Sequence, residues 1–261
     1  MQLPIPGPES GPLAPALRDF PPLTSPAQAA PLPYTRIENP SASNWSLSIS
    51  KRFFDVSAAI LCLTLFAVPM LLIALCIRLS SPGPALFVQN RLGRGGRLFG
   101  IYKFRSMVAG SGDSNGITAN GDLRITALGR CMRRLKIDEL PQLYNILRGD
   151  MSLVGPRPKL PQYEGIVNMP YRPGVTGAAT IVFRREEELL MHIHPSQRDL
   201  FYAQSIKPLK TSLDVRYMSH ATFWTDLRMI AATLVLCLKP ARVPRILAGE
   251  EKQLGADSIT A

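Results

Sequence analysis

The longest apolar segment of the chain covers residues 56–77, and only Ser57, Thr64 and Pro69 interrupt it. A helix of that length rises about 33 Å, which matches the hydrocarbon thickness of a bilayer. Basic side chains flank the segment on both sides. The pattern therefore predicts a long helix that enters a membrane.

Two topologies fit this segment, a helix that crosses the bilayer and one that enters and leaves on the same side. Pro69 lies just past the middle, where it removes a backbone hydrogen bond and bends the helix. Because Lys51 and Arg78 make both ends basic, the positive-inside rule tolerates both on the cytoplasmic face. The apolar run at 229–238 is too short to bring the chain back. We therefore favour a re-entrant helix-break-helix anchor over residues 45–80, whose freed carbonyl must be satisfied locally, with a plain span as the alternative.

A small β element is expected directly after the anchor. Two short apolar runs, at residues 85–89 and 98–102, flank a loop rich in Gly and Arg at 91–97. Such a pattern is typical of a strand pair. The loop could bind phosphate through its N–H groups, but it matches no nucleotide-binding fingerprint, and its arginines could equally lie along anionic lipid headgroups.

Two helices are expected in the middle of the chain. The first covers residues 128–135 and carries a basic face. The second is expected to begin at Asp138 as N-cap and to end at Arg148, with Gly149 as its stop signal. Its apolar residues share one face, namely Leu140, Leu143 and Leu147.

Further helices are expected towards the C-terminus. Pro208 is predicted to interrupt a helix that starts near Pro195, before another helix over 213–227. The run at 229–238 fits an interfacial helix or a core helix. The sequence thus predicts a monotopic, mainly α protein with a small β element, in which interfacial helices surround a small catalytic domain. Its expected parts are a disordered Pro-rich tail at 1–44, the anchor at 45–80, the catalytic domain at 81–240 and a polar tail at 241–261.

The composition of the first 44 residues separates them from the rest. They hold 11 of the 24 prolines, and proline fits neither a regular helix nor a central strand. This favours a disordered or polyproline-type tail. A segment that binds a partner through its Pro-rich stretches is the alternative.

The net charge of +11 predicts an anionic partner, which could be a nucleic acid, acidic lipid headgroups or a phosphorylated substrate. None of the four cysteines forms a CxxC pair, so a structural zinc site is not expected. The thiols are expected to lie in a core or against lipid in a reducing compartment.

The adjacent carboxylates Asp138 and Glu139 stand out within the basic part of the chain. Several cations precede them, at Arg130, Arg133, Arg134 and Lys136. The pair could simply cap and stabilise a helix. The same placement suits an ionised aspartate that holds a divalent cation beside a phosphate and attacks phosphorus.

Several short sequence blocks follow one another in a fixed order along the chain. Before the acidic pair they are Lys51-Arg52-Phe53-Phe54-Asp55, Ser81-Pro82-Gly83-Pro84, Gln89-Asn90-Arg91-Leu92-Gly93 and Tyr102-Lys103-Phe104-Arg105-Ser106-Met107. From the pair onwards they are Asp138-Glu139-Leu140-Pro141-Gln142-Leu143, Gly149-Asp150-Met151-Ser152-Leu153-Val154-Gly155-Pro156-Arg157-Pro158 and Arg172-Pro173-Gly174-Val175-Thr176-Gly177. In these blocks, over residues 50–235, the chain resembles the bacterial monotopic phosphoglycosyl transferases.

The resemblance implies transfer of a sugar 1-phosphate from a nucleoside diphosphate sugar to polyprenol phosphate, with Mg²⁺ as cofactor. It implies a two-step covalent route on the cytoplasmic face of the bacterial inner membrane, within a glycoconjugate or exopolysaccharide pathway. It also implies a re-entrant anchor. Neither the sugar nor the nucleotide follows from the sequence.

Roles for individual residues follow from the same resemblance. Asp138 matches the nucleophile and metal ligand, and Glu139 its partner. Lys103 and Arg133 match positions near the phosphates, and Arg105 is assigned to the same substrate-binding set. Arg157 and Arg172 match turns that build an anion pocket. A second essential carboxylate corresponds to Asp214.

The chain departs from the family pattern in two places. Residues 178–188 replace a segment that often reads Trp-Ala-Gln-Val, and this region is expected to face the sugar or the base. At the helix break, Ala67-Val68-Pro69 stands where the family has Ser-Pro. Substrate identity and the way the break is stabilised are the properties these departures affect.

A non-catalytic basic adaptor that binds anionic lipid or nucleic acid is the alternative function. Its basic runs carry no interleaved aromatic residues for stacking on bases, and aromatic residues make up only 7% of the chain. Nucleic acid is therefore not an expected partner. A homo-oligomer is left open by the sequence.

Overall fold

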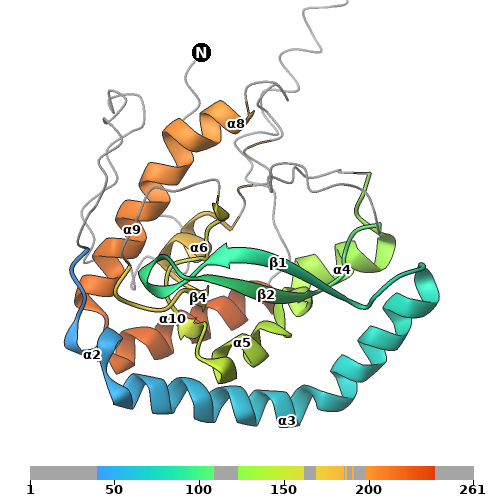
Figure 1. The fold of residues 1–261 in the computed structure, drawn as a ribbon, viewed down its shortest axis with the longest axis horizontal. Coiled ribbons are helices and arrows are strands. Elements are labelled where there is room, and N and C mark those ends of the chain that lie inside the picture. Colours follow the sequence, from blue (N-terminus) through green and yellow to red (C-terminus); the bar gives the residue numbers. More distant parts are fainter. Residues whose placement is uncertain are drawn as a thin grey trace, which may run out of the picture.

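The structure is a computed structural model that describes residues 40–108, 123–161, 169–184, 186, 190 and 198–238 (Figure 1). The predicted polar tail at 241–261 and almost all of the predicted Pro-rich tail at 1–44 lie outside these ranges.

The described part of the chain is mainly helical with two small sheets, as the sequence predicts. Its α-helices are α2 (Asn44–Leu47), α3 (Ile49–Ser80), α4 (Ala127–Leu135), α5 (Gln142–Arg148), α6 (Ala178–Val182), α8 (Arg198–Phe201), α9 (Lys207–His220) and α10 (Phe223–Leu238). Other helical turns are η2 (Arg94–Gly96), η3 (Ile137–Glu139) and the π-helix η6 (Tyr202–Ile206). The strands are β1 (Leu86–Leu92), β2 (Leu98–Phe104), β3 (Ser152–Val154) and β4 (Gly174–Thr176).

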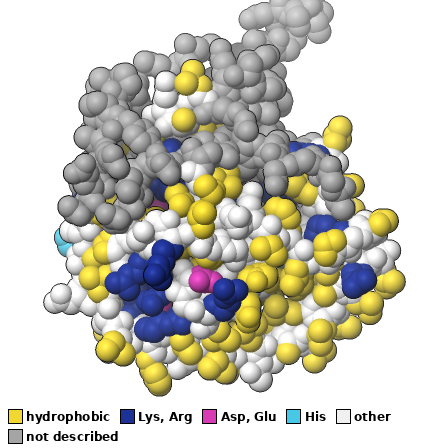
Figure 2. All heavy atoms as spheres, viewed as in Figure 1, with side chains coloured by type: hydrophobic (Ala, Val, Ile, Leu, Met, Phe, Trp, Pro, Cys, Tyr) yellow, Lys and Arg dark blue, Asp and Glu magenta, His cyan; other side chains and the backbone are white. Residues whose placement is uncertain are grey.

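Helix α3 contains the predicted apolar segment. It spans 32 residues without interruption, and the Ser48 side chain caps its start by accepting from the Lys51 N–H. Among the described residues it is the one helix long and apolar enough to cross a bilayer, and almost none of its most apolar stretch is buried. In Figure 1 it runs along the bottom of the molecule and then bends upward, and we attribute this bend to Pro69 within the helix. Figure 2 shows hydrophobic side chains along the corresponding lower and right-hand edges.

The predicted strand pair is confirmed. Strands β1 and β2 form an antiparallel hairpin with Leu86 opposite Phe104 and Leu92 opposite Leu98. Gly95 in its turn has a φ of 63°, which glycine adopts without a steric cost. Two further strands, β3 and β4, pair in parallel.

Both halves of α3 pack against the same globular body. Near its start, Ala59 is fully buried in a cluster with Ile101 of β2 and Ile146 of α5. Near its end, Ile77 packs with Phe104 of β2 and other residues, including Met132 of α4. A third cluster contains buried residues of β3, α6 and α9, including Val154, Ala178, Tyr217 and Met218.

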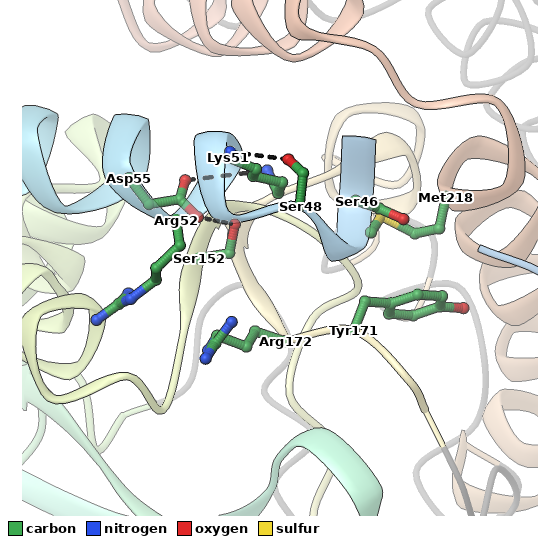
Figure 3. A pocket seen from close by; sticks show the side chains of 9 residues that line it. All are labelled: Ser46, Ser48, Lys51, Arg52, Asp55, Ser152, Tyr171, Arg172 and Met218. Carbon is green, nitrogen blue, oxygen red and sulfur yellow. Dashed lines mark hydrogen bonds and ion pairs between the residues drawn. The ribbon is translucent and has the colours of Figure 1, made fainter. Parts of the chain in front are cut away.

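Buried charged side chains bind the start of α3 to the globular domain. Lys51 and Asp55 lie one turn apart, with Nζ 3.9 Å from Oδ1. Asp55 accepts a hydrogen bond from the Ser152 hydroxyl at 2.8 Å (Figure 3) and another from the Leu153 N–H at 3.1 Å. This end of the helix is therefore bound to β3.

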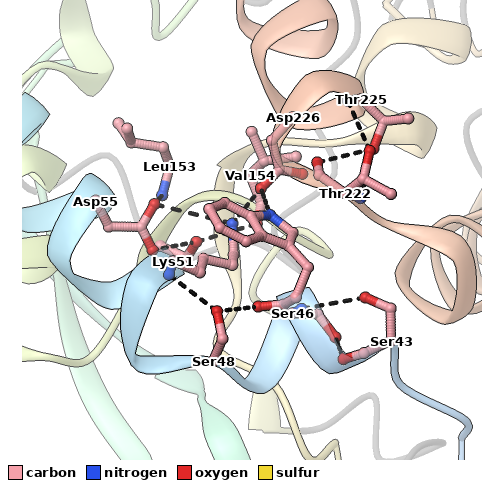
Figure 4. A network of polar contacts seen from close by, with 12 residues as sticks. Ser43, Ser46, Ser48, Lys51, Asp55, Leu153, Val154, Thr222, Thr225 and Asp226 are labelled. Atoms are coloured by element: carbon pink, nitrogen blue, oxygen red, sulfur yellow. Dashed lines mark hydrogen bonds and ion pairs between the residues drawn. The ribbon is translucent and has the colours of Figure 1, made fainter.

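Asp226 of α10 completes this network and is only 1% exposed (Figure 4). Its carboxylate accepts from Lys51 Nζ at 2.5 Å, Trp45 Nε1 at 2.9 Å and the Tyr217 hydroxyl at 2.7 Å. Buried ionic groups are retained where partners satisfy them, and here three donors do so. The network joins α2, α3, α9 and α10.

Arg105 fastens the other end of α3. Its guanidinium donates to the carbonyl oxygens of Pro82 at 2.6 Å, Ser81 at 2.8 Å and Ile77 at 3.3 Å. A cation at a helix C-terminus also stabilises the helix dipole. Arg105 thus closes the helix and ties it to the end of β2.

Three predictions about helix boundaries are wrong. The helix expected to start at Asp138 begins at Gln142, after Pro141, and Asp138 makes no capping hydrogen bond. Its expected end at Gly149 is confirmed, since that glycine takes a φ of 93°. The expected interruption at Pro208 is absent, because Pro208 stands in the first turn of α9, where a missing N–H costs little. The helix expected over 213–227 is divided, since α9 ends at His220 and α10 begins at Phe223.

Candidate active site

Asp138 and Glu139 lie in the short turn η3 between α4 and α5. Lys136 ends α4 in a left-handed conformation with a φ of 58°, which redirects the chain into this turn. Both carboxylates are buried, with exposed fractions of 7% and 5%. Asp138 Oδ1 is buried and has no hydrogen-bond partner among the described residues. The helix-capping interpretation of the pair is therefore wrong.

Glu139 is held by two cations from different elements. Lys103 of β2 lies 3.1 Å from Oε1, and Arg157, which follows β3, donates to the same oxygen at 2.7 Å. Burial alone would raise the pKa of Glu139, but Arg157 and Lys103 outweigh burial and hold the pKa well below its usual range. Glu139 is thus a fixed anion.

The surroundings shift the pKa values of Lys103 and Arg157 in opposite directions. Burial lowers the pKa of Lys103 to about 8, although Glu139 opposes this shift. The Glu139 carboxylate raises the pKa of Arg157 against the effect of burial. Arg157 is therefore the permanent partner of Glu139, and Lys103 is the cation that burial makes easier to deprotonate.

Asp138 differs from its neighbour in its environment. Burial raises the pKa of Asp138 and the charge on Glu139 adds to the effect, while Lys103, Lys136 and Arg133 oppose it. The two adjacent carboxyl groups thus differ in pKa and in their partners. Glu139 is committed to its cations, and Asp138 presents an oxygen with no partner.

Tight backbone contacts position Lys103 and Arg157. Asn145 of α5 is fully buried and accepts from the Tyr102 N–H at 3.0 Å while donating to the Gly100 carbonyl at 2.8 Å, which fixes β2 on α5. Where β3 and β4 meet, a Cβ on Gly174 would lie 2.1 Å from the Gly155 nitrogen. Only glycine permits this approach, and Arg157 stands two residues beyond Gly155.

Asp214 of α9 lies near the Arg157 turn. Its Oδ1 accepts a hydrogen bond from the Ala179 N–H at 3.0 Å. Burial raises the pKa of Asp214 to about 7, although the Ala179 N–H, Lys159 and the nearby backbone N–H of Arg157 oppose this shift. Asp214 therefore binds the start of α6 and lies close to the turn that carries Arg157.

The structure places Arg172 in a second cationic group, at the C-terminal end of α5. Arg172 Nε donates to the Gly149 carbonyl at 2.8 Å, and Arg52 donates to the Leu147 carbonyl at 3.1 Å. Figure 3 shows Arg52 and Arg172 on the wall of one small pocket. Burial lowers the pKa of Arg172, and the charges of Arg52 and Arg94 add to this effect.

Of the predicted site residues, the structure brings Asp138, Glu139, Lys103 and Arg157 together. The charge of Arg133 also acts on Asp138, and Asp214 lies close to the Arg157 backbone. It places Arg105 at the end of α3 and Arg172 beside α5. Their predicted phosphate-binding roles stay predictions. In Figure 2, Lys and Arg side chains gather around an acidic side chain on one face.

Sequence reasoning missed Arg52 and Lys210. A signal existed for Lys210, because it precedes Asp214 by four residues and therefore shares a helix face with it. Arg52 belongs to a matched block but was considered only as part of the anchor.

The description "bacterial sugar transferase" belongs to a family whose sequence model matches residues 46–240 of this chain. The chain belongs to this family. The matched range begins and ends within one residue of the limits expected for the anchor and the catalytic domain together.

Individual relatives agree with this assignment. An undecaprenyl-phosphate glucose phosphotransferase of Komagataeibacter xylinus is 37% identical over 78% of this chain and 38% of its own length. A UDP-N-acetylgalactosamine-undecaprenyl-phosphate N-acetylgalactosaminephosphotransferase of Aeromonas hydrophila is 38% identical over 70% of this chain and 42% of its own length. A UDP-glucose:undecaprenyl-phosphate glucose-1-phosphate transferase of Caulobacter vibrioides is 38% identical over 72% of this chain and 70% of its own length. The chain thus spans about two fifths of the first two proteins.

Proposed function

We propose that the chain transfers a sugar 1-phosphate from a nucleoside diphosphate sugar to polyprenol phosphate and releases a nucleoside monophosphate. Family membership and the names of its relatives support this class of reaction. The observation that carries the proposal is Asp138 Oδ1, a buried carboxylate oxygen that has no partner among the described residues and lies beside a carboxylate fixed by two cations.

In the first step, Asp138 Oδ1 attacks the phosphorus that bears the sugar. A bond forms between phosphorus and the aspartate, and the bond from that phosphorus to the bridging oxygen breaks. The nucleoside monophosphate leaves with the electron pair. Lys103 and Arg157 are cations next to the reacting carboxylate, and they would compensate the charge of the phosphates during transfer.

In the second step, an oxygen of polyprenol phosphate attacks the same phosphorus. The bond to Asp138 breaks and restores the carboxylate, and the sugar leaves as a polyprenol diphosphate sugar. Covalent catalysis of this kind divides one difficult transfer into two easier ones. Asp214 takes part only as a positioning residue, through the nearby Arg157 turn.

Mg²⁺ is the cofactor we propose, with Asp138 as its protein ligand. Among the described residues, no group of three or more His, Cys, Asp or Glu side chains could hold a metal by itself. The Asp138 carboxylate fits a cation shared with substrate phosphates, because Mg²⁺ is commonly bound by one or two carboxylates plus phosphate oxygens. Its second oxygen could hold the ion while Oδ1, which has no partner among the described residues, faces phosphorus. The bound ion would neutralise phosphate charge.

The protein in mild detergent with polyprenol phosphate and Mg²⁺ is expected to release nucleoside monophosphate from at least one nucleoside diphosphate sugar. Chelation with EDTA should abolish the release, and added Mg²⁺ should restore it. The assay measures nucleotide by chromatography across a panel of donors. Tight, salt-sensitive binding of anionic lipid or nucleic acid without turnover of any donor would favour the adaptor hypothesis.

We also propose that α3 is re-entrant, with the catalytic domain on the cytoplasmic face of the bacterial inner membrane. Lys51 near the start of the helix and the carbonyls at its end are both bound to the same globular body. A helix that crossed the bilayer would carry its ends to opposite sides. The apolar middle of α3 is exposed, as a lipid-facing segment must be.

Cysteine labelling tests this topology. After replacement of the four native cysteines, Ser50→Cys and Ser80→Cys stand near opposite ends of α3, and both positions are exposed. A membrane-impermeant maleimide should label both from the cytoplasmic side, because both ends leave the bilayer there. Val68→Cys, 65% exposed in the middle of the helix, is the control and should resist labelling in lipid. Labelling of residues 50 and 80 from opposite sides would establish a span.

A further inference from the structure

An ion pair lies beside the Arg157 turn, and neither step of the proposed reaction involves it. Lys210 of α9 binds Glu186, which follows α6, and the two side chains are only 15% and 20% exposed. Lys210 Nζ also lies 5.8 Å from the centre of the Phe183 ring and 5.5 Å from that of Tyr202. A half-buried ion pair against two aromatic rings is more costly to build than a surface pair.

Contacts along α9 connect this pair to the candidate active site. Lys210 and Asp214 are four residues apart on one face of the helix, and Asp214 lies close to the backbone of the Arg157 turn. Next to Lys210, Thr211 Oγ1 accepts from Lys159 Nζ at 2.7 Å, and Lys159 stands two residues after Arg157. The pair therefore borders the turn whose arginine binds Glu139.

The charges of the two sites also interact. Burial lowers the pKa of Lys210, and Arg157 contributes to this effect. Glu186 is among the carboxylates that raise the pKa of Arg157, after Glu139 and Asp138. An occupant of the region next to Arg157 would therefore meet Glu186 and Lys210 as well.

An unusual backbone segment accompanies the pair. Tyr202 is the first residue of the π-helix η6, which ends immediately before α9. π-Helical turns account for well under 1% of residues and occur frequently at functional sites. This observation does not depend on the charges, and it points to the same place.

We propose that Glu186 and Lys210, backed by Phe183 and Tyr202, bind the sugar of the donor and select which sugar is accepted. The proposal rests on the proposed function. Each sugar hydroxyl both donates and accepts hydrogen bonds, and a carboxylate beside an ammonium offers the complementary acceptor and donor. The aromatic carbons of Phe183 and Tyr202 add apolar surface, which ligand sites commonly combine with a few polar groups.

A nucleobase fits this place less well. Base recognition uses open aromatic faces for stacking, whereas Lys210 covers a face of both rings.

The test compares donors that share uridine diphosphate and differ by one hydroxyl epimer or one N-acetyl group. Wild-type protein defines the preferred donor through kcat/KM for nucleoside monophosphate release. In Lys210→Met and Glu186→Gln, the preference over the next donor is expected to fall about tenfold or more, because a hydrogen bond to the sugar is lost. An unchanged preference would overturn the inference, whereas a wild-type protein inactive with every donor would overturn the proposed function instead.

A charge-swapped protein, Glu186→Lys with Lys210→Glu, is the matched control. If the pair serves only folding, the swap should restore both the melting temperature and the donor preference of the wild type, and that result would contradict the inference. If the pair binds sugar, the preference should stay altered even where the melting temperature recovers. A second panel of donors carries one sugar on different nucleobases and tests whether the pair recognises the base instead. A change confined to base preference would also overturn the inference.

Discussion

Asp138→Asn is expected to abolish nucleoside monophosphate release, with a fall in rate of at least about 10³-fold. An amide has no charged oxygen to attack phosphorus. Glu139 cannot replace the lost group, because both Lys103 and Arg157 hold its Oε1. The variant and the wild type would be compared by nucleotide release at saturating donor, and by mass spectrometry of the peptide that carries residue 138. Only the wild type should gain the mass of a sugar phosphate.

Stability supplies the control for this variant. Asn has nearly the shape of Asp, and the exchange removes a buried carboxyl whose Oδ1 has no partner. Loss of an uncompensated buried group should leave the melting temperature unchanged or raise it, as at many active sites. Full activity in Asp138→Asn, or a sugar phosphate found on another residue, would be incompatible with the nucleophile assigned to Asp138.

Asp226→Ala is expected to lower the free energy of unfolding by about 3–5 kcal/mol, the usual cost of removing one partner of a buried ion pair. The change would leave Lys51 with only Asp55, 3.9 Å away, and would remove the acceptor of Trp45 and Tyr217. Unfolding in mild detergent can be followed by the fluorescence of the two tryptophans. Asp226→Asn keeps the shape and an acceptor, so it should cost less than Asp226→Ala.

Asp150→Ala provides a comparison for stability alone. Asp150 also pairs with a cation, Arg148 at 3.5 Å, but the two side chains are 52% exposed for Arg148 and 23% exposed for Asp150. Exposed pairs contribute roughly 0–1 kcal/mol, so this variant should unfold nearly as the wild type does. Equal losses in the two alanine variants would show that burial of the Asp226 network contributes nothing.

The parts of the fold that the sequence predicted depend on local patterns. The long apolar run forms α3, the two short apolar runs on either side of the Gly/Arg loop form the β1–β2 hairpin, and Gly149 ends α5. The start of α5 was missed because Lys136 takes a left-handed conformation and Pro141 delays the helix. The conformation of Lys136 has no signal in the side-chain pattern, whereas Pro141 is visible in the sequence and could have indicated the later start.

The candidate site was only partly predictable for a different reason. Matched blocks identified Asp138, Glu139, Lys103 and Arg157, which do lie together. The order of the blocks does not show, however, which way a side chain points. Arg105 directly follows β2 and donates to carbonyls at the end of α3. Partners far apart along the chain, such as Lys51 and Asp226, lack any local signal of their contact.

Fastening α3 at both ends has a mechanical consequence for the bilayer. A helix that spans a membrane meets a change in hydrocarbon thickness by tilting. Lys51 is bound to Asp226, and Arg105 is bound to the carbonyls of Ile77 in the last turn of α3 and of Ser81 just after it, so α3 cannot tilt independently of the domain above it. A re-entrant α3 would then enter the leaflet to a depth that is fixed relative to the domain. Thinning or thickening of the leaflet would therefore change the height of Asp138 above the lipid surface.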